Sequence, residues 1–177
     1  MQADPGKNYF ELFGLPGTYT INRSDLTARY QDLQRHFHPD KFSSSSDQER
    51  RLSVQMTALI NEAYQALKDP IARGQYILSL AGSNTDTETD TAMEPAFLLE
   101  QMELREKLEA LNDNPDAQRL TAMAESASEK MEIRVTQLHD LLDGHERNLE
   151  QARNVLREMQ FIDKLQREIE SLEDQLL

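Results

Sequence analysis

The feature that most constrains this chain is a proline that directly follows an amphipathic helical pattern, within the tripeptide His38-Pro39-Asp40. Proline cannot continue a helix and restricts the residue before it, so the chain must turn near His38. A serine-rich polar segment follows, and a second helical pattern begins at about residue 47. The sequence therefore predicts two helices joined by a polar loop and packed as an antiparallel hairpin. The apolar stripe that ends at the loop is spaced at i, i+4, i+7 and i+11 and consists of Leu26, Tyr30, Leu33 and Phe37.

Helical periodicity continues through the rest of the chain, and no useful run of strand-type alternation occurs, so the predicted fold class is all-α. In the first part we expect four helices: one around 9–13, one beginning near Asn22 or Ser24, one over 47–67 and one from Pro70 through Leu78. The apolar face of the third should consist of Leu52, Met56, Leu59, Ile60, Ala63 and Leu67. In the second part we expect three long helices, at about 94–111, 116–143 and 146–176, packed as a bundle in coiled-coil fashion.

A Thr- and Asp-rich stretch marks the division between the two parts, because it has nothing to bury and is typical of a linker. We predict an N-terminal domain over 7–80, a linker over 81–92 and a C-terminal three-helix bundle over 93–177. Residues 1–81 carry nine Lys/Arg and nine Asp/Glu, whereas residues 82–177 carry ten and 23, so the whole net charge of −13 lies in the second part. Such an acidic half argues against nucleic-acid binding, because it repels phosphates.

The composition argues against several further classes of protein. With no cysteine, the chain can form no disulfide, no thiolate nucleophile and no zinc–cysteine site. No apolar run is long enough to span a membrane, and the first residues lack the apolar stretch of a secretory signal. We therefore expect a cytoplasmic protein that has no membrane partner and no cofactor.

A metal site is the catalytic alternative that the tripeptide leaves open. His36, His38 and Asp40 could form an H-x-H-x-D cluster of the kind found in a small metal-dependent hydrolase. Pro39, however, separates two of these residues on a turn, and the two remaining histidines lie in the far domain. A catalytic metal needs about three protein ligands and an open position. We therefore expect neither a metal nor a catalytic residue here.

Helix 94–111 carries two apolar stripes where a bundle needs only one. The stripe that should form the bundle core consists, at about 100° per residue, of Phe97, Leu104, Leu108 and Leu111. Leu98, Leu99 and Met102 then lie on roughly the opposite side, with Glu106 and Glu109 beside them. Surplus apolar surface usually marks a partner site, and methionine suits adaptable contacts. The alternative is that this second stripe packs against the N-terminal domain or the linker.

Four segments, in order and at appropriate spacing, resemble a J-domain, the module that stimulates ATP-driven chaperones of the DnaK type. They are Tyr9–Leu15, His38–Lys41, Ile60–Leu67 and Asp69–Tyr76, the last being similar to the Asp-Pro-x-x-Arg-x-x-Tyr element that closes the domain. Lys41-Phe42 and the run Phe97–Glu106 look specifically like the HscB family, J-proteins dedicated to iron–sulfur cluster biogenesis. The resemblance spans nearly the whole chain. Some members carry an N-terminal cysteine-rich metal site that this chain lacks, which suggests the bacterial type.

The resemblance implies a non-enzymatic co-chaperone with an N-terminal J-domain hairpin and a C-terminal bundle. Its J-domain would dock on the ATP-bound chaperone HscA and promote ATP hydrolysis, and its bundle would bind the cluster scaffold IscU. The implied chaperone-binding residues are His38, Pro39, Asp40, Lys41, Arg35 and Arg29, the last three being equally consistent with ordinary solvated cations. The implied client-binding residues are Leu98, Leu99, Met102 and Phe161, with Glu103 and Glu106 as a polar rim. The alternatives are a J-protein with another client, a small metal-dependent hydrolase and a purely structural coiled-coil protein.

Overall fold

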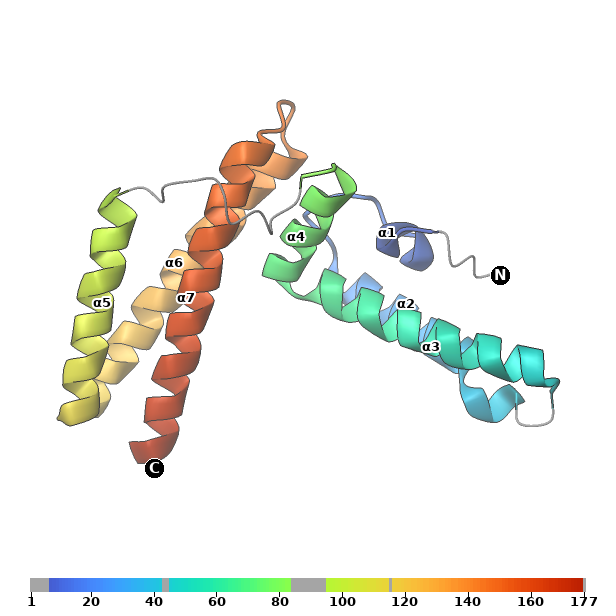
Figure 1. The fold of residues 1–177 in the computed structure, drawn as a ribbon, viewed down its shortest axis with the longest axis horizontal. Coiled ribbons are helices and arrows are strands. Elements are labelled where there is room, and N and C mark those ends of the chain that lie inside the picture. The colour runs from blue at the N-terminus through green and yellow to red at the C-terminus, as the bar shows by residue number, and fades with distance from the viewer. Residues whose placement is uncertain (1–6, 43–44, 84–94, 115, 177) are drawn as a thin grey trace. The chain divides into compact units, whose positions relative to one another are not determined.

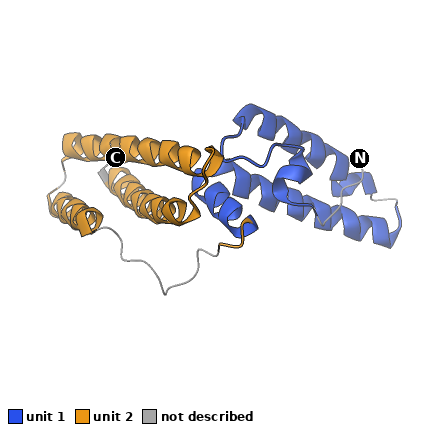
Figure 2. Ribbon diagram, turned by 90° about the horizontal axis from the view of Figure 1, so that it is seen from above, with its two compact units in different colours: residues 1–80 blue, residues 81–177 orange. Residues whose placement is uncertain are grey.

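The computed structural model describes residues 7–42, 45–83, 95–114 and 116–176, so most of the predicted linker lies outside the described residues. Within these ranges the chain forms helices and no strand, and the predicted all-α class is confirmed (Figure 1). The chain divides into two compact units, Met1–Leu80 and Ala81–Leu177, and each unit is described by itself (Figure 2).

The N-terminal unit is a helical hairpin with two shorter helices packed against it (Figure 1). Its elements are α1 (Tyr9–Phe13), α2 (Arg23–Phe37), the 3₁₀ helix η1 (Pro39–Phe42), α3 (Asp47–Lys68) and α4 (Pro70–Leu80). The helices α2 and α3 run antiparallel and side by side, as predicted, and both α1 and α4 contact α3. Of the two candidate caps of α2, Asn22 is the one used, because its side chain accepts hydrogen bonds from the N–H groups of Ser24 and Asp25.

The core of this unit combines the apolar stripes of the long helices with side chains of α1 and α4. Its buried members are Phe10, Leu12, Phe13, Tyr19, Leu26, Leu33, Met56, Ile60, Ala63, Leu67, Ile77 and Leu78. The prediction for α3 is wrong at its first position, because Leu52 is exposed and Ser53 is buried. Leu52 and Ser53 lie about 50° to either side of the mean direction of Met56, Ile60, Ala63 and Leu67, so the helical period does not separate them. Ser53 is the one whose hydroxyl donates to the Phe37 carbonyl of α2.

The Asp69–Tyr76 element ties α3 to α4. Asp69 Oδ1 accepts a hydrogen bond of 2.7 Å from the backbone N–H of Ala72 and so caps the start of α4. The buried guanidinium of Arg73 lies over the ring of Tyr19, and its Nη1 donates to the carbonyl of Leu67 at 2.7 Å. Burial lowers the pKa of Arg73. Arg73 thereby supplies a hydrogen-bond donor to the Leu67 carbonyl, which lies in the last turn of α3 and has no partner within that helix.

Tyr76, at the end of the same element, holds the short helix α1. Its ring stacks on Tyr9 with centroids 4.2 Å apart, and its hydroxyl accepts a hydrogen bond of 2.9 Å from the Tyr9 N–H. The Tyr9 hydroxyl donates to Glu62 Oε1 on α3 at 2.7 Å. Burial, together with that carboxylate, raises the pKa of Tyr9 to about 12. A helix of five residues is not stable alone in water, so α1 depends on these tertiary contacts.

The other end of α1 is closed by Gly14 and by Arg29 of α2. Gly14 has a φ of +62°, and its N–H donates to the carbonyl of Glu11 at 3.1 Å. Arg29 Nη1 donates to the carbonyls of Phe13 at 2.8 Å and Gly14 at 3.0 Å. A Cβ atom at position 14 would lie 2.8 Å from this Nη1 atom. The left-handed backbone conformation therefore favours glycine, and a Cβ atom here would also push the Arg29 guanidinium aside.

The C-terminal unit is a three-helix bundle, as predicted. Its helices are α5 (Pro95–Asp113), α6 (Ala117–Asp143) and α7 (Leu149–Leu176). The helices α6 and α7 pack along their length, and α5 packs mainly against α7 (Figure 1). A single apolar cluster joins the three helices and consists of Leu108, Leu111, Leu120, Met123, Ala127, Ile162, Leu165 and Ile169. The Asp116 side chain caps α6 by accepting from the N–H groups of Gln118 and Arg119.

We expect Gly14→Ala to lower the free energy of unfolding of the N-terminal unit by about 2 kcal/mol. The left-handed backbone conformation costs a residue with a side chain about 1–2 kcal/mol, and the new Cβ also displaces the Arg29 guanidinium. Thermal unfolding followed by circular dichroism measures this loss. Gly17→Ala is the matched control, because a Cβ at Gly17 meets no atom within 4 Å. Equal melting temperatures for the two variants would contradict this account.

Candidate functional site

The His-Pro-Asp tripeptide forms a tight and exposed connection between the two hairpin helices. His38 is the C-cap of α2 and Pro39 begins η1. The N–H of Lys41 donates to the His38 carbonyl at 3.0 Å, and the N–H of Asp40 donates to His38 Nδ1 at 3.3 Å. With Nδ1 as an acceptor, the neutral imidazole carries its proton on Nε2. The imidazole is half exposed and the Asp40 carboxylate almost wholly exposed, so both groups can reach a partner.

Two hydroxyls of α3 fix the point at which the chain leaves α2. Ser53 Oγ and Thr57 Oγ1 donate to the carbonyl of Phe37, at 2.7 Å and 3.0 Å. Phe37 is the last residue of α2, and the last carbonyls of a helix have no partner within it. The sequence analysis missed both residues. The signal that could have found them is a serine on the buried stripe of α3, with a threonine one turn further along.

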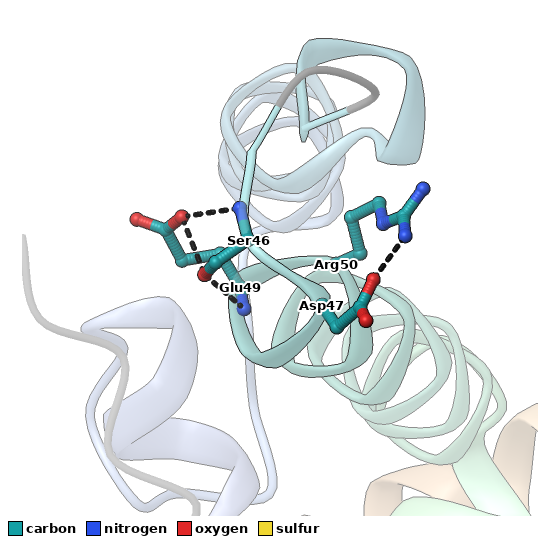
Figure 3. Close-up of polar contacts among 4 residues, drawn as sticks. All are labelled: Ser46, Asp47, Glu49 and Arg50. Atoms are coloured by element: carbon teal, nitrogen blue, oxygen red, sulfur yellow. Dashed lines mark hydrogen bonds and ion pairs between the residues drawn. The ribbon is translucent and has the colours of Figure 1, made fainter.

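A capping box fixes the other side of the connection, at the start of α3 (Figure 3). The Ser46 N–H and hydroxyl donate to Glu49 Oε2 at 2.9 Å and 2.8 Å, and the Glu49 N–H donates back to Ser46 Oγ at 3.3 Å. The hydrogen bond from the Ser46 backbone N–H, and to a lesser degree the one from the Ser46 hydroxyl, lower the pKa of Glu49. Asp47 and Arg50 form an ion pair beside the box. The connection is therefore anchored at both of its helices.

Stacked tyrosines brace α2 against α3 behind the connection. The rings of Tyr30 and Tyr64 lie 4.0 Å apart, and the Tyr30 hydroxyl donates to Asn61 Oδ1 at 2.9 Å. The Gln34 side chain donates to the same Asn61 oxygen. These contacts fix one face of α2 on α3. The opposite face of α2 therefore keeps a fixed orientation relative to α3.

The three cations that the resemblance assigns to chaperone binding have different surroundings. Lys41 is exposed, within η1. Arg35 is exposed on the last turn of α2 and forms an ion pair with Asp32 of the same helix. Arg29 is bonded to the end of α1 and precedes His38 by nine residues, which is roughly 13 Å along a helix. The structure therefore places Lys41 and Arg35 next to the tripeptide and gives Arg29 a packing contact as well.

The two predicted stripes of α5 are confirmed by the burial of its side chains. Phe97, Leu108 and Leu111 are buried, and Leu104 packs partly buried against the same cluster. On the other side the exposed fractions are 42% for Leu98, 62% for Leu99 and 63% for Met102. Glu103 and Glu106 are exposed beside them. Large apolar side chains gathered in this way are typical of a binding surface.

Phe161 of α7 lies where that helix contacts α5. It is partly exposed, and its ring meets the Phe97 ring edge-to-face with centroids 6.1 Å apart. Phe97 directly precedes Leu98 in the chain. The name apolar patch is used below for the exposed side chains of Leu98, Leu99 and Met102 on α5 together with that of Phe161 on α7.

Neither a metal-binding cluster nor a helix that could span a membrane occurs among the described residues. His36 Nδ1 lies 3.1 Å from the backbone carbonyl of Asp32, and His38 Nδ1 is engaged by Asp40. No group of three or more potential ligands is arranged to hold a metal ion among the described residues. None of the helices so described combines the length and the apolar character needed to cross a bilayer.

Comparisons with known proteins agree with this geometry. Residues 93–170 match the family described as the HSCB C-terminal oligomerisation domain. The chain is 44% identical over 171 residues to the co-chaperone protein HscB homolog of Aliivibrio salmonicida, which covers 96% of this chain and 99% of that protein. Its structure is similar to that of the chaperone HscB from Vibrio cholerae, with a TM-score of 0.85, 41% identity and coverage of 97% of this chain and 100% of that one. Human co-chaperone HscB gives a TM-score of 0.86 at 29% identity, over 94% and 82% of the two chains.

The helical hairpin with its His-Pro-Asp connection, together with these relatives, places the chain in the class of J-domain co-chaperones. The chain belongs to the HscB family of that class, the co-chaperones of iron–sulfur cluster assembly.

We expect the paired variants Ser53→Ala and Thr57→Val to be strongly non-additive. Each hydroxyl can satisfy the Phe37 carbonyl alone, so a single substitution should cost less than about 1 kcal/mol of unfolding free energy, while the double substitution should cost about 2–3 kcal/mol. Denaturant unfolding of the four proteins measures the cycle. Ser79→Ala is the control, because the Ser79 hydroxyl donates to a carbonyl at an exposed position. Simple additivity of the two losses would argue against a shared acceptor.

Proposed function

We propose that this protein stimulates ATP hydrolysis by an HscA-type chaperone and delivers to it an IscU-type iron–sulfur scaffold. The observation that carries the first half is the exposure of His38 and Asp40 on a connection anchored at both ends. Pro39 fixes the backbone between them. The imidazole N–H and the carboxylate can then each form one directed hydrogen bond with the chaperone, without first having to order a flexible loop.

The cations around the tripeptide supply long-range attraction to an acidic surface of the chaperone. Lys41 and Arg35 lie next to His38 and act at short range. Arg29 adds its charge from further along α2 while it holds the end of α1. Exposed charges of this kind accelerate association more than they strengthen the complex, and their effect falls with added salt.

The second half of the proposal rests on the apolar patch of the C-terminal unit. Leu98, Leu99 and Met102 are exposed on α5, and Phe161 joins them from α7. Burying them against the scaffold supplies the apolar centre of the interface, and Glu103 and Glu106 form its polar rim. Because the two surfaces belong to one chain, a bound scaffold is kept at a high effective concentration near the chaperone.

We expect His38→Gln to reduce the stimulation of the steady-state ATPase of a purified HscA-type chaperone by at least about tenfold, since a directed hydrogen bond is lost or misplaced. The melting temperature should not change, because the imidazole is half exposed. His139→Gln is the matched control: His139 is also half exposed, and its Nδ1 lies 2.9 Å from Asp140 Oδ1 on α6. Full stimulation by a folded His38→Gln protein would remove the docking role.

We expect Leu98→Ala, Leu99→Ala and Met102→Ala together to weaken binding of purified IscU-type scaffold by about a hundredfold, because most of the apolar area is removed. Isothermal titration calorimetry measures the affinity. Stimulation of the chaperone without scaffold should be unchanged. Ile133→Ala is the control, because Ile133 is an exposed apolar residue of α6 outside the patch. An unchanged affinity of the triple variant would assign the patch to another contact, and failure of the unmodified chain to bind would reject this client.

A further inference from the structure

The most unusual polar group of the C-terminal unit is the side-chain amide of Gln101 on α5. Gln101 is only 8% exposed, and its Nε2 atom is buried without a hydrogen-bond partner among the described residues. A buried donor without a partner costs a folded protein about 1–3 kcal/mol. An apolar residue of similar shape at this position would avoid that cost in the free chain.

Gln101 lies at the boundary between the bundle core and the apolar patch. At about 100° per residue, its direction on α5 is about 40° from that of Phe97 in the core and about 60° from that of Leu98 in the patch. It also borders a small cavity of about 30 Å³ beside Phe161. The cavity is lined by Gln101, Arg105, Phe161, Lys164, Leu165 and Glu168. A space of this size holds one water-sized group, such as a single oxygen atom of a partner.

The Gln101 amide lies where a group of a bound partner could reach it. Arg105 and Lys164 are exposed, so the cavity that they line with Gln101 reaches the surface. Phe161, which also lines the cavity, is itself partly exposed and belongs to the apolar patch. A partner that buries the patch also excludes water from around Phe161, and a hydrogen bond formed there is stronger than one made in water.

We infer that Gln101 donates a hydrogen bond to an acceptor oxygen of the client that docks on the apolar patch. The inference rests on the proposed function and adds a rule of specificity to it. Leu98, Leu99 and Met102 can bind any apolar partner surface. A buried amide, in contrast, disfavours a partner that places no acceptor oxygen against it. The acceptor is a carbonyl or a carboxylate; a carboxylate would be attracted by Arg105 and Lys164 and repelled by Glu168, which line the same cavity.

The test is the substitution Gln101→Met in the full chain, which keeps the length and shape of the side chain and removes the donor. The dissociation constant for purified IscU-type scaffold, measured by calorimetry, should rise about five- to tenfold. The melting temperature of the free protein should stay the same or rise, because an unpaired buried donor has been removed. Gln118→Met, at an exposed position of α6, is the control and should change neither quantity. Repetition at high salt identifies the acceptor, because the ratio of the two affinities falls for a carboxylate and holds for a carbonyl.

Two results with the Gln101→Met variant would overturn the inference. One is an unchanged affinity of the Gln101→Met variant for a scaffold that the unmodified chain binds, which would leave the proposed function intact. The other is a fall in melting temperature together with the loss of affinity, which would show that Gln101 serves only the free fold. Gln101→Leu repeats the measurement if the methionine variant does not fold. Failure of the unmodified chain to bind the scaffold would overturn both the inference and the proposed function.

Discussion

The N-terminal unit depends on the pairing of one backbone carbonyl, that of Phe37. Pro39 prevents α2 from continuing, and the final carbonyls of a helix have no partner inside it. Ser53 and Thr57 supply two donors from α3, so the end of α2 is attached directly to the neighbouring helix. The backbone that carries His38 and Asp40 therefore starts from a fixed position at the end of α2. Their side chains are exposed and remain accessible to a partner.

The two proposed recognition surfaces differ in their physical chemistry. The connection in the N-terminal unit offers a few polar groups whose directions are set by the backbone, which suits the choice of one orientation on a partner. The apolar patch of the C-terminal unit offers area without direction, which suits strength of binding. Gln101 supplies a directed group next to that area. The acidic balance of the second part of the chain opposes self-association of such an exposed surface through like-charge repulsion.

The helices, the turn at His38-Pro39-Asp40 and the exposed second stripe of α5 could be predicted from the sequence because each depends on local rules. Proline and glycine mark the ends of helices, and the spacing of apolar residues separates the core side of α5 from its second stripe. The positions of Ser53, Arg29 and Gln101 could not be predicted in this way. Whether a hydroxyl, a guanidinium or an amide finds a hydrogen-bond partner depends on how one helix is rotated about its axis relative to its neighbour. The apolar period of a single helix gives no information on that rotation. The incorrect placement of Leu52 in the core has the same origin.

The contacts of α1 have a consequence for the order in which the N-terminal unit folds. Five residues cannot nucleate a helix, and the groups that hold α1, Tyr76, Glu62 and Arg29, come from three other helices. We therefore expect α1 to form after α2, α3 and α4 have assembled, and to detach before the hairpin itself opens. Its amide protons should exchange with solvent well before those of the hairpin, while the presentation of His38 persists.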